Sequence, residues 1–188
     1  GRHRRWTAGN LGRRGDLVDL MMQAEERGDL SHAEVIGYLT TLTIAGNETT
    51  TKLLANTVYQ LWRHPQQKTL LLADRALLAG SIEETLRFDT PVHLQARRVA
   101  RDVELHGRTL REGDKVGLLY LSANRDERKF AAADRYEIKR NPRDHMGFGY
   151  GLHACLGSAL ARLEVRVALE KLLDLAADWD IDEAGIVR

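Results

Sequence analysis

The sequence predicts a mainly α-helical fold with small β-sheets (α+β). Apolar residues recur at helical spacing in four segments, residues 16–28, 31–64, 65–88 and 156–179. Between the third and fourth of these, residues 93–120 form short β-like runs separated by turns that contain glycine. Hydrophobic residues make up 43% of the chain, which is ordinary for a globular protein, so these elements can enclose a core.

Charge and cysteine content exclude several classes of protein. The formal net charge is +1, which predicts no nucleic-acid partner and no membrane surface. Residues 1–16 are basic, but no apolar segment of signal-peptide type follows, and no apolar run approaches the roughly 20 residues that span a bilayer. The single cysteine excludes an intramolecular disulfide, as in a reducing compartment. We therefore expect a cytoplasmic protein.

The first two helices carry recognisable end signals. Asp16 can cap the first helix, and Gly28 can end it. Ser31 and Glu34 form a capping box for the second, which should run toward His64, where Pro65 follows. Its middle, residues 45–51, reads AGNETTT and contains poor helix formers, so we expect a distorted turn there.

The remaining elements follow in order. Residues 65–88 should form a short helix and then a longer one. Residues 106–107 (His-Gly) and 112–113 (Glu-Gly) suit turns between short strands. Residues 122–147 lack periodicity and predict a long irregular stretch. The last helix has an apolar stripe made of Leu156, Leu160, Leu163, Val167 and Leu172.

Cys155, the only cysteine, supports several interpretations. A lone cysteine is commonly a small buried apolar side chain. This one stands where the last helix begins, and helix dipoles favour a thiolate there, while the neighbouring glycines allow close approach of a cofactor. Zinc is an alternative, because His145, His153 and Cys155 could supply three ligands. A cysteine nucleophile with His153 as its base is another.

The segment FGYGLHACLG, residues 148–157, resembles the haem-binding loop of the cytochrome P-450 family, Phe-x-x-Gly-x-His/Arg-x-Cys-x-Gly. The resemblance implies that Cys155 is the thiolate ligand of haem iron. It also implies that His153 hydrogen-bonds a haem propionate and that Phe148 packs beside the sulfur, with Gly149 and Gly157 making room for the porphyrin.

Two further segments resemble the same family. The EETLR segment contains Glu84 and Arg87, which resemble its Glu-x-x-Arg pair. The resemblance implies a buried structural pair that locks this helix to the irregular stretch before the cysteine, although an ordinary surface ion pair is the alternative from spacing alone. Arg97 resembles the arginine that binds the second propionate, with Arg98 as the alternative.

The weak helical turn resembles the Ala-Gly-x-Asp/Glu-Thr segment of the family's long distal helix. The resemblance implies that Ala45 and Gly46 lie against the haem and leave room for dioxygen. It implies that Glu48 and Thr49 are the acid–alcohol pair that delivers protons for oxygen activation, with Thr50 as the alternative alcohol.

Taken together, these segments imply one partial domain, residues 1–188, with a partial cytochrome P-450 fold from the long distal helix through the helix after the cysteine. The N-terminal half and the final β-hairpin of the family would be absent. The implied function is a haem-thiolate monooxygenase with haem b, which takes electrons from a ferredoxin-type donor and oxidises a small organic substrate. Residues near Leu42, Ala45 and 91–94 would contact that substrate. A haem-binding fragment without turnover is the alternative.

Overall fold

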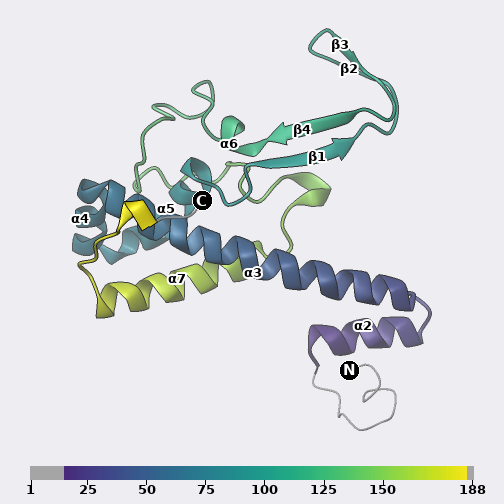
Figure 1. Ribbon diagram of the computed structural model, residues 1–188, viewed down its shortest axis with the longest axis horizontal. Helices are drawn as coiled ribbons and strands as arrows, with labels where there is room; N and C mark the ends of the chain where they lie inside the picture. The colour runs from purple at the N-terminus through teal and green to yellow at the C-terminus, as the bar shows by residue number, and fades with distance from the viewer. Residues whose placement is uncertain (1–14, 186–188) are drawn as a thin grey trace. The chain divides into compact units, whose positions relative to one another are not determined.

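The computed structural model describes residues 15–185, and the basic opening segment, residues 1–14, lies outside them. The chain divides into two compact units, residues 1–48 and residues 49–188. The elements are α2 (Leu17–Glu26), α3 (His32–Arg63), α4 (Pro65–Ala73), η1 (Arg75–Leu77), α5 (Leu78–Phe88), β1 (Leu94–Arg98), β2 (Val103–Leu105), β3 (Arg108–Leu110), β4 (Lys115–Leu119), α6 (Tyr120–Ala123), η2 (Gly151–His153), α7 (Ser158–Leu175) and η3 (Glu183–Gly185) (Figure 1). The expected class, helices with small β-sheets, is confirmed.

The helix signals of the first unit act as expected. The Asp16 side chain accepts a hydrogen bond from the backbone N–H of Asp19 at 3.1 Å, which caps α2. Before α3, the Ser31 N–H donates to the Glu34 carboxylate at 2.8 Å and the Glu34 N–H donates to the Ser31 hydroxyl at 3.3 Å. This is the reciprocal capping box that the sequence predicts.

Helix α3 is regular where the sequence suggested a distortion. Residues 45–51 are α-helical throughout, so the expected distorted turn is wrong. Just before them, Thr40, Thr41 and Thr43 each donate their hydroxyl to the carbonyl four residues earlier, at 2.8 Å. Threonine hydroxyls can thus be satisfied inside a helix, which explains how this polar stretch of α3 remains helical.

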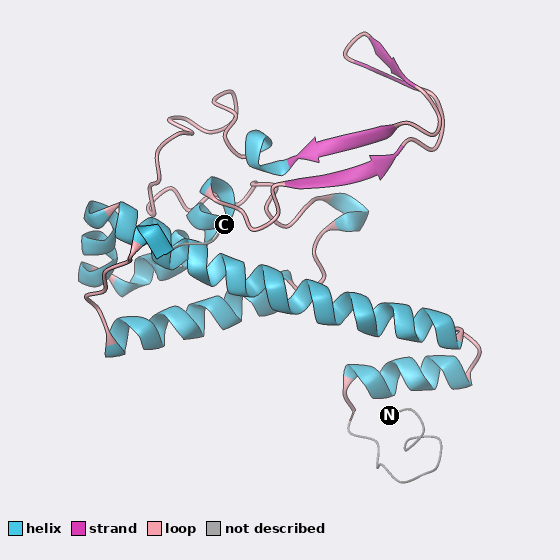
Figure 2. Cartoon of the chain, viewed as in Figure 1, coloured by secondary structure: helices cyan, strands magenta, loops and turns pink. Residues whose placement is uncertain are grey.

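The strands form two antiparallel pairs, and in chain order all of them follow α5 and precede α6 (magenta in Figure 2). Strand β1 pairs with β4, with Leu94 opposite Leu119. Strands β2 and β3 form a hairpin whose two turn residues, His106 and Gly107, have φ of 50° and 71°. Positive φ at both positions is what a type I′ turn requires, so the expected turn is confirmed.

The core of the second unit lies where α5 and α7 pack together with the second half of α3, α4 and part of the irregular stretch. Its buried members are Leu53, Leu61, Leu71, Leu78, Ile82, Leu86, Tyr136, Ile138, Val165, Leu169 and Leu173. The expected irregular stretch, residues 122–147, has no helix or strand apart from its first two residues, which belong to α6, and two of its residues enter this core. Within residues 15–185, no helix is long and apolar enough to cross a membrane.

Helix α7 does not bury the stripe that the sequence emphasises. Leu156, Leu160 and Leu163 are 89%, 58% and 56% exposed, and Val167 is also exposed. The buried residues of α7 are instead Val165, Leu169 and Leu173, with Leu172 partly buried. The helix has apolar residues on more than one face, and contact with α5 selects the second one.

A glycine in α5 marks the tightest packing in this core. A Cβ added at Gly80 would lie 2.4 Å from the backbone carbonyl oxygen of Ile138. Gly37, an exposed helical glycine in α3, has no neighbouring atom within 4 Å of the same position. Only the first of these glycines is therefore required by packing.

We predict that G80A lowers the free energy of unfolding by about 1–3 kcal/mol, because the added methyl forces the Ile138 backbone away. The control, G37A, should raise it by up to about 1 kcal/mol through helix propensity. Urea denaturation followed by circular dichroism measures both. Equal stability of G80A and wild type would contradict the packing described for α5.

Candidate functional site

The loop that carries Cys155 is closed by backbone hydrogen bonds. The Cys155 N–H donates to the Phe148 carbonyl at 2.8 Å, and the Gly149 N–H donates to the Met146 carbonyl at 2.9 Å. Gly149 has φ of 70°, and a Cβ there would lie 3.1 Å from the His153 carbonyl oxygen. Both the φ angle and this contact favour glycine at position 149. The two hydrogen bonds then hold one compact turn that contains Phe148, Gly149, His153 and Cys155.

Helix α7 begins immediately after this turn. Its N-cap is Gly157, whose lack of a side chain leaves the first backbone N–H groups of the helix without a side-chain acceptor. The positive end of the helix dipole is therefore directed at the loop, where it favours a negative charge. The Cys155 side chain is exposed at this end of α7.

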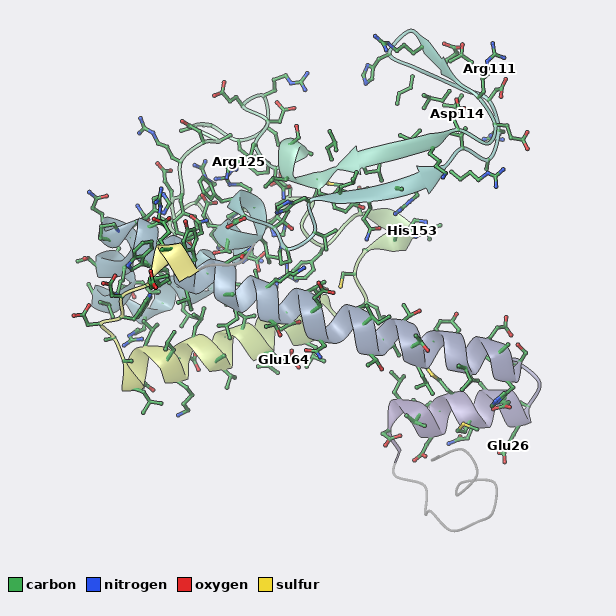
Figure 3. The ribbon with its side chains drawn as sticks, viewed as in Figure 1. Glu26, Arg111, Asp114, Arg125, His153 and Glu164 are labelled. Carbon is green, nitrogen blue, oxygen red and sulfur yellow. The ribbon has the colours of Figure 1, made fainter. Side chains whose placement is uncertain are left out.

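The surroundings of Cys155 suit a flat, apolar cofactor. Tyr150, Leu152 and Leu156 are all more than four-fifths exposed. Gly151 and Gly157 have no atom within 4 Å of the position a Cβ would take, so the backbone there can be approached closely. An accessible thiol among exposed apolar side chains and open glycines fits a haem, which these residues would hold. His153 is exposed on η2 (Figure 3).

Glu84 and Arg87 form a fully buried ion pair on α5. Arg87 donates from Nε and Nη2 to the two carboxylate oxygens, at 2.9 and 2.8 Å. Its Nη1 donates to the carbonyls of Asn124 and Ala133, at 3.0 and 2.8 Å, and Nη2 also donates to the Arg135 carbonyl at 2.9 Å. The guanidinium thereby ties α5 to the irregular stretch.

Glu84 is equally well satisfied. It accepts from the Glu137 N–H at 2.9 Å and from Arg140 Nε at 3.2 Å. Nearby, Arg125 donates to the carbonyl of Phe88, the last residue of α5 (Figure 3). A buried charge pair is tolerated when such hydrogen bonds satisfy the atoms that the pair itself leaves over. These contacts fix the start of the chain segment that leads to Cys155.

A second network was missed by sequence reasoning. Glu83, the neighbour of Glu84, accepts from Arg162 Nε at 2.6 Å and from His145 Nε2 at 3.0 Å. Burial acts to raise the pKa of Glu83, but the hydrogen bonds from His145 and Arg162, with the charge of Arg162, hold it at about 2, below its ordinary 4.5. No spacing in the sequence signals contacts across 62 and 79 residues.

The other candidate residues are placed on separate elements. Arg97 lies on β1, half-buried, and donates to the Ala96 carbonyl at 2.9 Å. Ala45, Gly46, Glu48 and Thr49 lie within five residues of α3, and the unit boundary falls between the last two. The approach of these four residues to a haem stays a prediction.

The zinc alternative finds no support in the geometry. Within residues 15–185, no group of three or more His, Cys, Asp or Glu side chains could hold a metal ion together. His145 is buried and both of its ring nitrogens are engaged, Nε2 with Glu83 and Nδ1 with the N–H of Gly147. It is therefore not available as a third ligand beside His153 and Cys155.

Comparison with known proteins identifies the family. The family model for cytochrome P450 matches residues 69–175, more than half of the chain, including α5, the strands, the cysteine loop and α7. The chain belongs to the cytochrome P450 family. Its cysteine loop and its buried Glu84–Arg87 pair both lie within the matched segment.

Named cytochromes P450 are similar along most of the chain. Putative cytochrome P450 123 from Mycobacterium bovis is 45% identical over 175 residues, which cover 92% of this chain and 44% of that protein. Steroid C26-monooxygenase from Mycolicibacterium smegmatis is 42% identical, covering 91% of this chain and 43% of that protein. The crystal structure of CYP109E1 from Bacillus megaterium with testosterone matches with a TM-score of 0.77 and 40% identity, covering 81% of this chain and 43% of that one. This P450 chain therefore spans less than half the length of these relatives.

The buried pair generates a stability prediction. R87A should lower the free energy of unfolding by about 3–5 kcal/mol, because it leaves Glu84 charged and buried without its main partner. The matched control is R166A, which breaks the exposed pair of Arg166 with Glu170 on α7 and should cost less than about 1 kcal/mol. Urea denaturation of both variants decides the matter. An R87A cost no larger than that of R166A would show that the pair is not what holds α5 to residues 124–140.

Proposed function

We propose that this chain is the haem-binding part of a cytochrome P450 monooxygenase, with haem b as its cofactor and Cys155 as the thiolate ligand. The observation that supports it most is the exposed thiol in a glycine-rich turn at the N-terminus of α7, in a chain of this family. When bound, haem supplies oxygen activation, so that one atom of dioxygen enters the substrate and the other leaves as water.

Several residues of the second unit would hold the cofactor. Phe148 would pack beside the sulfur, Gly149 would keep the loop in its tight turn under the cofactor, and the open position at Gly157 would admit the porphyrin edge. His153 would donate a hydrogen bond to one propionate, and Arg97 would bind the other with its planar guanidinium. The exposure of His153 and the half-buried position of Arg97 leave both side chains able to take these roles.

The proton path would come from α3. Thr49 Oγ1 would donate a proton toward the reacting oxygen, and the Glu48 carboxyl would restore it from solvent, which Glu48 faces. Ala45 and Gly46 would keep the adjacent helix surface free of bulk, as the open space at Gly46 allows. Side chains of adjacent helical residues point about 100° apart, so Glu48 and Thr49 would occupy different positions. The proton would pass from the Glu48 carboxyl to the Thr49 hydroxyl.

The finer assignments rest on the family alone. A ferredoxin-type protein would supply electrons to this cytoplasmic enzyme, and the substrate would be a small organic molecule contacted near Leu42, Ala45 and residues 91–94. Relatives of similar identity have names that point to different substrates, among them steroids and cyclomarin C. Because the chain spans about 44% of such a relative, a haem-binding fragment without turnover is the second candidate.

Titration of haem into the 188-residue chain tests the proposal. Wild type should give the absorption that marks a thiolate ligand in the reduced carbonyl complex, and C155S should lose it because serine offers no thiolate. The control S158A, at the first residue of α7, should keep it. Identical spectra for wild type and C155S would refute Cys155 as the ligand, and a thiolate spectrum without product formation would favour the fragment.

The proton path has its own test in the complete enzyme supplied with its electron donor. T49A should lower the product formed per reductant consumed by about tenfold or more, because the positioned hydroxyl that delivers the proton is lost. The neighbouring variant T50A serves as the control and should stay close to wild type. If T50A uncoupled the enzyme and T49A did not, the alcohol would be Thr50.

A further inference from the structure

Glu83 joins two segments on opposite sides of Cys155 in the sequence. The carboxylate binds Arg162 in a bidentate pair, with Nε to Oε1 at 2.6 Å and Nη2 to Oε2 at 3.0 Å. The same carboxylate accepts from His145 Nε2 at 3.0 Å. His145 lies ten residues before Cys155 and Arg162 lies seven residues after it, on the second turn of α7. One side chain of α5 thus holds both ends of the cysteine loop.

The hydrogen bonds around His145 fix its orientation. Its Nδ1 accepts from the N–H of Gly147 at 3.0 Å, so the ring proton is on Nε2 and is donated to Glu83. The His145 side chain is only 2% exposed. A Cβ at Gly147 would lie 2.8 Å from the Leu86 carbonyl oxygen, so this part of the loop is pressed against the backbone of α5.

Arg162 is linked to Cys155 through Phe148. Its guanidinium lies 4.5 Å from the centre of the Phe148 ring, and the Phe148 carbonyl accepts the N–H of Cys155. The hydrogen bond to Glu83 raises the pKa of Arg162, against the lowering effect of its partial burial, and the charge of Glu83 adds to the increase. A fixed positive charge is therefore held on the Phe148 side of the loop by Glu83.

We infer that Glu83 is a positioning residue, which holds His145 and Arg162 so that the turn between Phe148 and Cys155 keeps one geometry and one local charge. The role belongs to the cysteine loop itself, and its effect on haem rests on the proposed function. Glu83 and Arg162 are not among the residues of the sequence motifs. Their contribution comes from holding the backbone and the charge near the sulfur, without contact with the iron.

Amide hydrogen exchange of the haem-free 188-residue chain tests the geometry. E83Q keeps the side-chain volume but replaces one acceptor oxygen by a donor, so exchange across residues 146–157 should rise by about tenfold. The variant R162Q, which acts from a partly exposed position, should raise exchange in the same residues. The control E170Q, on the exposed face of α7, should match wild type. If E83Q lost protection throughout the core, its effect would reflect unfolding, and the exchange of residues 146–157 in R162Q alone would test the positioning role.

The haem-loaded protein tests the charge. E83Q removes a negative charge and leaves Arg162 unbalanced, so the reduction potential should rise, because positive charge stabilises the reduced state. R162Q removes the positive charge, so the potential should fall. A residue that is merely structural would shift both variants in the same direction.

The two readouts separate the possible failures. Unchanged exchange of residues 146–157 in both variants would overturn the positioning role, and potentials that move together would overturn the contribution of the local charge. If the chain bound no haem at all, the proposed function would fail, and the exchange experiment would still decide on Glu83.

Discussion

A fully buried ion pair joins α5 to the irregular stretch of the second unit. Removing Glu84 and Arg87 from water costs several kcal/mol per ion, and this cost is offset only because every charged atom has a partner. Those partners include backbone carbonyls from residues 124–135, a stretch without helix or strand to satisfy them. The guanidinium on α5 is therefore one main constraint on the shape of the irregular stretch, and the cysteine loop follows directly from that stretch.

Two neighbouring carboxylates of α5 bind two different loops. Successive helical residues point about 100° apart, so Glu84 and Glu83 face different partners. Glu84 faces the irregular stretch, whereas Glu83 faces His145 and Arg162. The cysteine loop is consequently anchored at its start and at its end by one rigid helix. Such anchoring adds to the backbone hydrogen bonds that close the glycine-rich turn around Cys155.

Local signals in the sequence predicted most of the elements, whereas the candidate site residues came from resemblance to the family. Caps, turns and periodicity depend on neighbours within a few residues, which explains why the Ser31–Glu34 box and the His106–Gly107 turn were found. Contacts across many residues have no such signal, so the Glu83 network was missed. The buried face of α7 was also missed, because periodicity cannot tell which of two apolar stripes meets α5. The weak turn of α3 was misjudged because propensity is a small term that helix context outweighs.

The uncovered leucines of α7 affect how the chain behaves as a solute. Leu160, Leu163 and Val167 present adjacent apolar surface to water along one side of a helix. A formal net charge of +1 provides little repulsion between molecules. Hydrophobic contact between these faces of two molecules is then favourable, and electrostatic repulsion does little to prevent it. The exposed face of α7 is thus one surface through which molecules of this chain would associate as their concentration rises.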